Sequence, residues 1–103
     1  MSKYGARRTE VDGIMFASAK EARRYSELRL LQRAGEITDL TRQPRYPIVI
    51  NDVKVCTYVA DFSYLEKGAA RVTVEDAKGF KTDIFNLKRK LMWAVHNIEV
   101  LIT

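Results

Sequence analysis

Apolar positions along the chain recur with two periods, one typical of amphipathic helices and one typical of half-buried strands. The helical period predicts one helix over residues 18–34 and a second from Thr82 or Asp83 to about His96. Shorter runs predict strands over residues 48–50, 53–65, 71–78 and 98–102, with a short strand or extended lead-in at 37–40. This order indicates an α/β fold. The chain ends as strand, helix and strand, so the last strand should lie parallel to a central strand of a mixed sheet, through a right-handed crossover.

Local signals mark the ends of the first helix and the direction of its inner face. Ser18, followed three residues later by Glu21, forms a capping box. Gly35 is a typical stop signal after the last turn. At about 100° per residue, Glu21, Tyr25 and Leu28 fall on one stripe, so Glu21 should point toward the core. The capping box also explains Glu21 without any metal, and both interpretations stay open.

Turn-forming residues divide the remaining chain. Asp12-Gly13 predicts a turn that joins two short strands, and Asn51-Asp52 predicts a second turn. Pro44 and Pro47 should interrupt regular strand pairing around Arg45-Tyr46, because proline has no N–H to donate to a ladder.

The segment VTVEDAKG carries an acid and an amine two residues apart at the end of a strand. Asp76 and Lys78 should therefore point to the same face. A turn at residues 66–69 would place Asp61 opposite Val74 and make it a diagonal neighbour of Asp76, about 7–8 Å away between Cα atoms. Two such carboxylates can bind one divalent cation. A solvated ion pair between Asp76 and Lys78 is the simpler alternative.

Composition narrows the class of protein. The 103 residues suffice for a single domain over 1–103, in which residues 1–10 form a basic arm or an early edge strand. A net charge of +5 favours phosphate-bearing partners. With no apolar run of about 20 residues and no apolar stretch after the basic start, we expect a cytoplasmic protein without a membrane partner. Cys56 and His96 each stand alone, which excludes an internal disulfide and cysteine- or histidine-rich metal sites.

Glu21, Asp61, Asp76 and Lys78, in this order, resemble the PD-(D/E)xK nuclease superfamily. The segments KYGARRTEVDGIMFASAKEARRYSELRLLQRAGEI, QPRYPI, YVADFSY, VEDAKGFKT and FNLKRKLM resemble a family of small phage proteins without an assigned function. They are also similar to phage Holliday-junction resolvases of the endonuclease I type and to the endonuclease subunit of some transposases. Ala60 departs from the signature, which has proline there.

The resemblance implies a restriction-endonuclease-like core of helix, three strands, helix and strand. It implies an Mg²⁺-dependent DNA endonuclease acting on branched or structured DNA in phage recombination, replication or packaging, within the host cytoplasm. Mg²⁺ or Mn²⁺ would be bound by Asp61, Asp76, the Ala77 carbonyl and Glu21, all oxygen ligands that suit a hard cation. Lys78 would position water and stabilise charge in the transition state, with general-base catalysis as its second role. Hydrolysis would leave a 5′-phosphate.

Further residues are candidates for partner surfaces. Backbone contacts to DNA are expected from the basic residues Arg7, Arg8, Arg42, Arg45, Lys81 and Lys88, although each could be a solubilising surface charge. On the second helix the main apolar stripe comprises Ile84, Leu87, Leu91, Ala94 and Val95. A second patch, formed by Phe85, Met92 and Trp93, lies roughly opposite. It predicts either a homodimer interface or a surface covered by the N-terminal arm.

Two alternatives to an endonuclease that acts alone follow from the same residues. The first is a non-catalytic DNA-binding or recombination-accessory protein that keeps the fold. The second is a nickase subunit that cleaves only with a partner protein.

Overall fold

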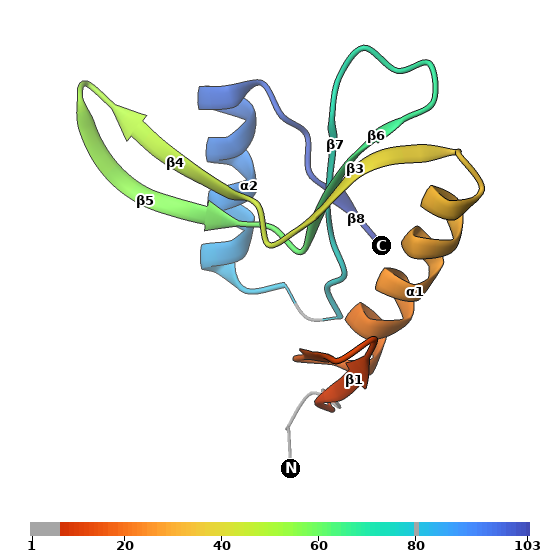
Figure 1. The fold of residues 1–103 in the computed structure, drawn as a ribbon. Helices are drawn as coiled ribbons and strands as arrows, with labels where there is room; N and C mark the ends of the chain where they lie inside the picture. Colours follow the sequence, from red (N-terminus) through yellow and green to blue (C-terminus); the bar gives the residue numbers. More distant parts are fainter. Residues whose placement is uncertain (1–6, 80) are drawn as a thin grey trace.

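A computed structural model of the chain describes residues 7–79 and 81–103 (Figure 1). It contains two helices and eight short strands within these residues. In chain order they are β1 (Thr9–Val11), β2 (Ile14–Phe16), α1 (Ala19–Arg33), β3 (Ile37–Arg42), β4 (Arg45–Ile50), β5 (Val53–Val59), β6 (Phe62–Glu66), β7 (Thr73–Asp76), α2 (Asp83–His96) and β8 (Leu101–Ile102). No helix among the described residues is long and apolar enough to cross a bilayer.

A mixed four-stranded sheet forms the centre of the molecule, in the order β3-β6-β7-β8. The first three strands are antiparallel, and β8 runs parallel to β7. The predicted α/β class and the parallel final strand are therefore confirmed. The last strand is shorter than predicted, since only Leu101 and Ile102 pair with β7.

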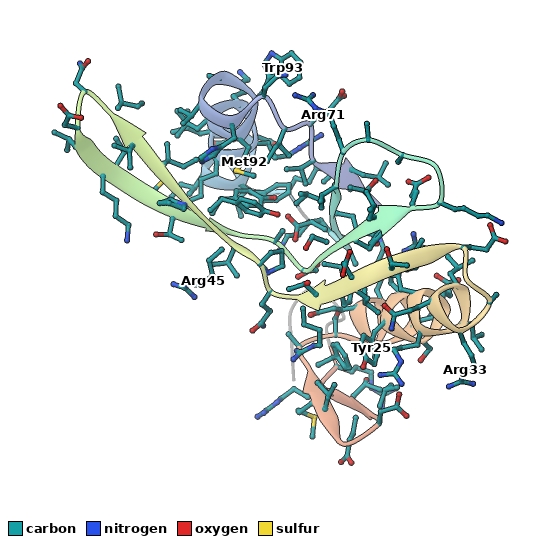
Figure 2. The ribbon with its side chains drawn as sticks, turned by 45° about the horizontal axis from the view of Figure 1, so that its top comes forward. Tyr25, Arg33, Arg45, Arg71, Met92 and Trp93 are labelled. Carbon is teal, nitrogen blue, oxygen red and sulfur yellow. The ribbon has the colours of Figure 1, made fainter. Side chains whose placement is uncertain are left out.

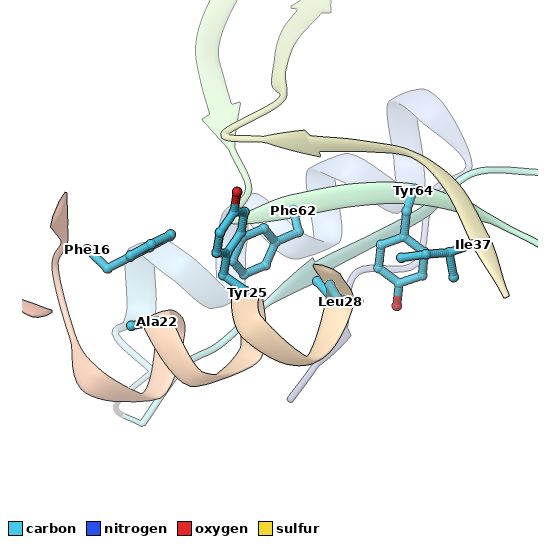
Figure 3. Packing of buried hydrophobic residues seen from close by; sticks show 7 residues of the cluster. All are labelled: Phe16, Ala22, Tyr25, Leu28, Ile37, Phe62 and Tyr64. Carbon is cyan, nitrogen blue, oxygen red and sulfur yellow. The ribbon is translucent and has the colours of Figure 1, made fainter. Parts of the chain in front are cut away.

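The two helices cover opposite faces of this sheet (Figure 1). On one face, Tyr25 and Leu28 of α1 pack on Phe62 and Tyr64 of β6 (Figure 3). On the other face, Met92 of α2 belongs to a second apolar cluster, whose other buried members are Ile48, Tyr58, Ala60, Val74 and Val100. Phe62 and Tyr64, two residues apart on β6, both belong to the first cluster, as the pleat of a strand requires.

The signals that were expected to begin and end α1 act as predicted. The Ser18 hydroxyl accepts a hydrogen bond from the Glu21 N–H at 3.1 Å. Gly35 has a φ of 82°, and the Glu36 N–H donates to the Leu31 carbonyl, which closes the last turn. Glu21, Tyr25 and Leu28 are buried, so the predicted inner face of this helix is confirmed.

Strands β4 and β5 form a separate two-stranded ribbon that projects from the sheet (Figure 1). Asn51 and Asp52 form its turn, both with positive φ. The expectation that prolines interrupt pairing here was wrong, because Pro47 lies within β4 opposite Thr57. A two-stranded ribbon has free edges, and an edge strand tolerates a residue without an N–H.

The single long strand predicted over 53–65 was also wrong. The chain leaves the ribbon at Ala60 and Asp61 and enters the central sheet as β6. Two backbone hydrogen bonds make this crossing: the Ala60 N–H donates to the Pro44 carbonyl, and the Gln43 N–H donates to the Asp61 carbonyl. Each half of the run therefore pairs with different strands, which periodicity alone cannot reveal.

The register of β6 and β7 differs from the predicted one by two residues. Phe62 pairs with Glu75 and Ser63 with Val74, so Asp61 lies beyond the ladder at the level of Asp76 and not of Val74. The loop before β7 is longer than the predicted turn, because β7 begins at Thr73. A shift of two residues keeps every side chain on its face. The predicted shared face of Asp61 and Asp76 is therefore retained.

The predicted inner face of α2 was partly wrong. Leu91 and Val95 of the expected stripe do pack against the core cluster. Met92 is fully buried, and Phe85 packs against the same core cluster, whereas Ile84 and Leu87 are 67% and 56% exposed. Phe85 and Met92 therefore belong to the core and cannot form the expected dimer patch. Only Trp93 of that patch is exposed (Figure 2). Apolar residues lie on both sides of this helix, so the sequence does not show which side faces the ribbon.

The N-terminal region is only partly described. Residues 9–16 form the β1–β2 hairpin that was predicted around Asp12-Gly13. The remainder of the expected basic arm, residues 1–6, lies outside the described residues.

A buried ion pair joins α1 to β7. Arg24 donates to both oxygens of Glu75, at 2.6 and 3.0 Å, and Glu75 is fully buried. The Tyr64 hydroxyl donates a further hydrogen bond to Glu75, at 2.5 Å. These three donors compensate for the loss of water around a charged carboxylate.

Replacing Arg24 by methionine would leave the Glu75 carboxylate buried without its cation. We expect Arg24→Met to lower the free energy of unfolding by about 3 kcal/mol or more. Arg24 also contacts the exposed Glu27 at 3.4 Å, and Glu27→Gln should cost less than about 1 kcal/mol. Urea denaturation measures both, and equal losses would contradict the assignment of the buried pair as the stabilising one.

Candidate active site

An open cleft of about 640 Å³ lies where the start of α1 meets the ends of β5 and β7. Its polar lining consists of Ser18, Lys20, Glu21, Arg23, Gln43, Asp61 and Lys78. Asp76 lies directly behind this surface and is fully buried. The structure therefore brings Glu21, Asp61 and Lys78 to one cleft, with Asp76 bonded to Asp61 from below.

Two hydrogen bonds join Asp61 to the end of β7 at Asp76 and Ala77. The Asp61 N–H donates to Asp76 Oδ1 at 2.8 Å, and the Ala77 N–H donates to Asp61 Oδ2 at 2.7 Å. Each carboxylate thus accepts a backbone N–H from the other strand. Because Asp61 lies past the end of the β6–β7 ladder, these two bonds continue the strand pairing through side chains and fix both carboxylates.

The second oxygen of Asp76 accepts a hydrogen bond from the hydroxyl of Tyr58. Tyr58 is buried in the core cluster beneath α2, and its ring centroid lies 6.3 Å from that of Phe85. Burial and the neighbouring Asp76 raise the pKa of the Tyr58 hydroxyl, so Tyr58 remains a proton donor. Nothing in the spacing of Tyr58 and Asp76 along the chain predicted this contact.

Burial also raises the pKa of the Asp76 carboxyl, to about 6, and the nearby Asp61 charge adds to the effect. The hydrogen bonds from Tyr58 and from the Asp61 N–H limit the rise. The pKa of Glu21 is raised for the same reasons, first by burial and then by Asp61, while Arg42 and Lys78 lower it. Burial is therefore the main reason that both acids hold their protons more tightly than free carboxyls, and their proximity to Asp61 adds to it.

Lys78 follows Asp76 at the end of β7. Its ammonium lies 5.3 Å from the centroid of the Phe85 ring, within range of a cation–π contact. The Lys20 ammonium donates to the Lys78 carbonyl at 3.2 Å and joins the start of α1 to this segment. Lys20 and Arg23 were not predicted as site residues, although both flank Glu21 in the first turn of its helix.

The position at which the nuclease signature has proline is Ala60, which is 1% exposed. Its N–H donates to the Pro44 carbonyl at 3.1 Å. Proline has no N–H and could not form this bond. The bond that turns the chain from the ribbon into the sheet therefore favours a residue other than proline.

The six residues predicted to contact DNA do not line the cleft. Arg7, Arg8, Arg45 and Lys81 are exposed, and Lys88 is half buried on α2 (Figure 2 labels Arg45). Arg42 lies near Glu21 and is 4.8 Å from the centroid of the Phe16 ring. Its buried Nε has no hydrogen-bond partner among the described residues. Arg42 is the member of this set that adjoins the cleft.

The donor chemistry of the cleft fits a hard divalent cation, since Glu21, Asp61, Asp76 and the Ala77 carbonyl all offer oxygen. The arrangement fits only in part. Among residues 7–79 and 81–103, no three acidic, histidine or cysteine side chains are grouped closely enough to hold a metal ion. Both aspartates are bonded to backbone N–H groups, and Asp61 Oδ1 takes part in no hydrogen bond within the described residues.

The raised pKa of Asp76 predicts a specific pH dependence in metal-free buffer. The folded protein binds this proton more tightly than the unfolded chain, whose pKa is near 3.8. The stability that the folded state gains from protonated Asp76 is therefore fully present below pH 4 and is lost as the pH rises through about 6. Relative to Asp76→Asn, the free energy of unfolding of the wild type should fall by on the order of 3 kcal/mol across this range. Parallel curves by chemical denaturation would contradict the shift.

Comparison with known proteins identifies a family. Neither curated proteins nor solved structures show a significant similarity to this chain. A family model matches residues 1–102, which is nearly the full length, and its description is "Protein of unknown function (DUF1064)". The chain therefore belongs to the DUF1064 family.

Proposed function

We propose that the protein is a metal-dependent endonuclease that hydrolyses DNA phosphodiesters, built on a restriction-endonuclease-like core. The observation that supports this most is the pair of hydrogen bonds that joins Asp61 to Asp76 and to its neighbour Ala77. It joins two acids that lie 15 residues apart in the chain, beside Glu21 and Lys78, at one open cleft. The resemblance to PD-(D/E)xK nucleases assigns catalysis to these same four residues.

Asp61, Asp76, the Ala77 carbonyl and Glu21 would hold Mg²⁺ or Mn²⁺. When bound, such an ion acidifies water and neutralises charge on a scissile phosphate. The raised pKa values of Glu21 and Asp76 support this part of the proposal, because they reflect acids that are buried and lie near a further acid, Asp61. Binding requires Asp61 or Glu21 to turn toward Asp76, since the carboxylates do not yet surround one position.

Lys78 is the residue that we assign to charge stabilisation. It lines the same cleft as Glu21, and its charge lowers the pKa of that carboxyl. An ammonium in this position can contact a phosphate oxygen and orient an attacking water. General-base catalysis is the second choice, since the surrounding carboxylates favour its protonated form.

DNA is proposed to bind through its backbone. Lys20 and Arg23 line the cleft and Arg42 adjoins it, so cations lie beside the acids that would meet the scissile phosphate. Such contacts position a duplex without reading its sequence. Branched or structured DNA in phage recombination, replication or packaging is the substrate that the resemblance favours.

A non-catalytic DNA-binding or recombination-accessory protein is the second candidate. It is favoured by the backbone bonds of Asp61 and Asp76 and by the absence of three metal-ligating side chains grouped within the described residues. In that case the two aspartates would only connect the strand ends. Such a protein would bind DNA equally well with EDTA. A nickase subunit would instead cleave only when its partner protein is added.

The variant Asp61→Asn tests catalysis with little change to the structure. Its amide oxygen can still accept the bond from the Ala77 N–H, while the negative charge is lost. We expect Mg²⁺-dependent cleavage of nicked, forked and four-way DNA substrates to fall by a factor of about 100 or more, with DNA binding retained.

Asp76→Ala should abolish cleavage in the same assay. Glu27→Gln is the control, because Glu27 is an exposed acid of α1 that does not line the cleft. Undiminished cleavage by Asp61→Asn and Asp76→Ala would end the assignment. Wild-type protein that binds DNA but leaves every substrate intact, with Mg²⁺ or Mn²⁺, would favour the non-catalytic candidate.

The proposed backbone contacts predict a change in salt dependence. Each lost phosphate contact lowers the slope of log affinity against log salt concentration by about 0.9 on duplex DNA. We expect Lys20→Ala and Arg23→Ala each to show this loss. Arg33→Ala, at the exposed far end of α1, should show none (Figure 2). Fluorescence anisotropy at several salt concentrations measures the slopes, and equal slopes for all three variants would contradict binding in the cleft.

A further inference from the structure

Two adjacent carboxylates on β7 point to opposite faces of the sheet, and each accepts a hydrogen bond from a buried tyrosine. Tyr58, from the ribbon, donates to Asp76 on the side of α2. Tyr64, from β6, donates to Glu75 on the side of α1. The two tyrosines are 2% and 4% exposed, and both carboxylates are fully buried. The contacts are alike in chemistry and in burial, and they differ in the side of the sheet that they serve.

The Tyr58 hydroxyl and the Asp61 N–H together restrict the orientation of the Asp76 carboxylate more than the Asp61 N–H does alone. The Asp61 N–H holds Oδ1, and the Tyr58 hydroxyl holds Oδ2. Two donors on different oxygens fix both the position and the rotation of a carboxylate, whereas one donor leaves the group free to rotate about its last bond. Asp76 has no partner of opposite charge within hydrogen-bond distance among the described residues, unlike Glu75 with its arginine.

The place of Tyr58 in the packing is equally specific. Its ring lies in the core cluster beside Phe85, and Phe85 in turn carries the Lys78 ammonium over its own ring. Tyr58 thus connects the carboxylate of Asp76 and, through Phe85, the amine of Lys78 to the same buried cluster under α2. Removing the Tyr58 hydroxyl would free the Asp76 carboxylate while leaving the contacts of the Tyr58 ring in place.

We propose that Tyr58 is a positioning residue, whose hydroxyl holds the Asp76 carboxylate in the orientation required to bind a divalent cation. This inference rests on the proposed function, since it assumes that Asp76 is a metal ligand. Groups that orient metal ligands without touching the metal commonly change metal affinity by a factor of 10 to 100 when removed. Tyr58 would act in that way on Asp76.

The test measures binding of Mn²⁺ alone, without DNA, by titration calorimetry of the full chain. Tyr58→Phe is compared with Tyr64→Phe, which removes the matching hydroxyl on the other side of the sheet. We expect the Kd for Mn²⁺ to rise about tenfold or more in Tyr58→Phe and to change less than about twofold in Tyr64→Phe. A tyrosine that only satisfies a buried acceptor would give the same result at both positions.

A third variant separates positioning from folding. Tyr58→4-aminophenylalanine keeps the ring and places a weaker N–H donor at the same point, so it should recover part of the lost Mn²⁺ affinity. It also preserves the test if Tyr58→Phe is unfolded, which circular dichroism shows. A folded Tyr58→Phe that binds Mn²⁺ as tightly as the wild type would overturn the inference, as would equal losses in Tyr64→Phe.

Titration of the wild type separates a failure of the proposed function from a failure of the role of Tyr58. If the wild type binds no Mn²⁺ and cleaves no DNA, the proposed function fails, and the role of Tyr58 fails with it. If the wild type binds Mn²⁺ and Asp61→Asn abolishes cleavage, while Tyr58→Phe keeps its affinity, only the role of Tyr58 is refuted.

Discussion

The candidate site depends on one interaction, the exchange of hydrogen bonds between Asp61 and the end of β7. Strand pairing between β6 and β7 stops at Phe62 and Glu75, and the next residues continue it through side chains. Asp76 accepts from the Asp61 N–H, and Asp61 accepts from the Ala77 N–H. Because buried backbone N–H groups must be paired, these bonds stabilise the fold and also fix the positions of the two carboxylates. The same two acids therefore stabilise the strand ends and supply the charge of the cleft.

The two faces of β7 solve the problem of a buried carboxylate in different ways. Glu75 is paired with Arg24, whose charge compensates for burial, and with Tyr64. Asp76 receives only neutral donors, so part of the cost of burial remains and its pKa rises to about 6. An acid kept in this state gains most from a cation that arrives later. Within the described residues no cation is hydrogen-bonded to Asp76, and this is the electrostatic feature that most favours a ligand site over a purely structural pair.

The sequence predicted those parts of the structure that depend on local chemistry. Ser18 and Gly35 define the ends of α1, and the pleat alone places Asp61 and Asp76 on one face even though the predicted register was two residues off. The parts that failed depend on distant partners. The break at Ala60 is set by the Pro44 carbonyl, and the inner face of α2 is chosen by the ribbon that it covers. The contact of Tyr58 was not predicted for the same reason, since its partner Asp76 lies 18 residues away on a different strand.

The tandem Glu75-Asp76 has a consequence for insertions and deletions in the loop before β7. A slip of β7 by one residue would exchange the two side chains between the faces of the sheet. A slip that moves Asp76 into the place of Glu75 also moves Ala77 into the place of Asp76, and the opposite slip moves Val74 into the place beside Arg24. Either slip would leave one of the two sites without its carboxylate. Natural variation in the length of this loop should therefore be tolerated only where the register of β7 is unchanged.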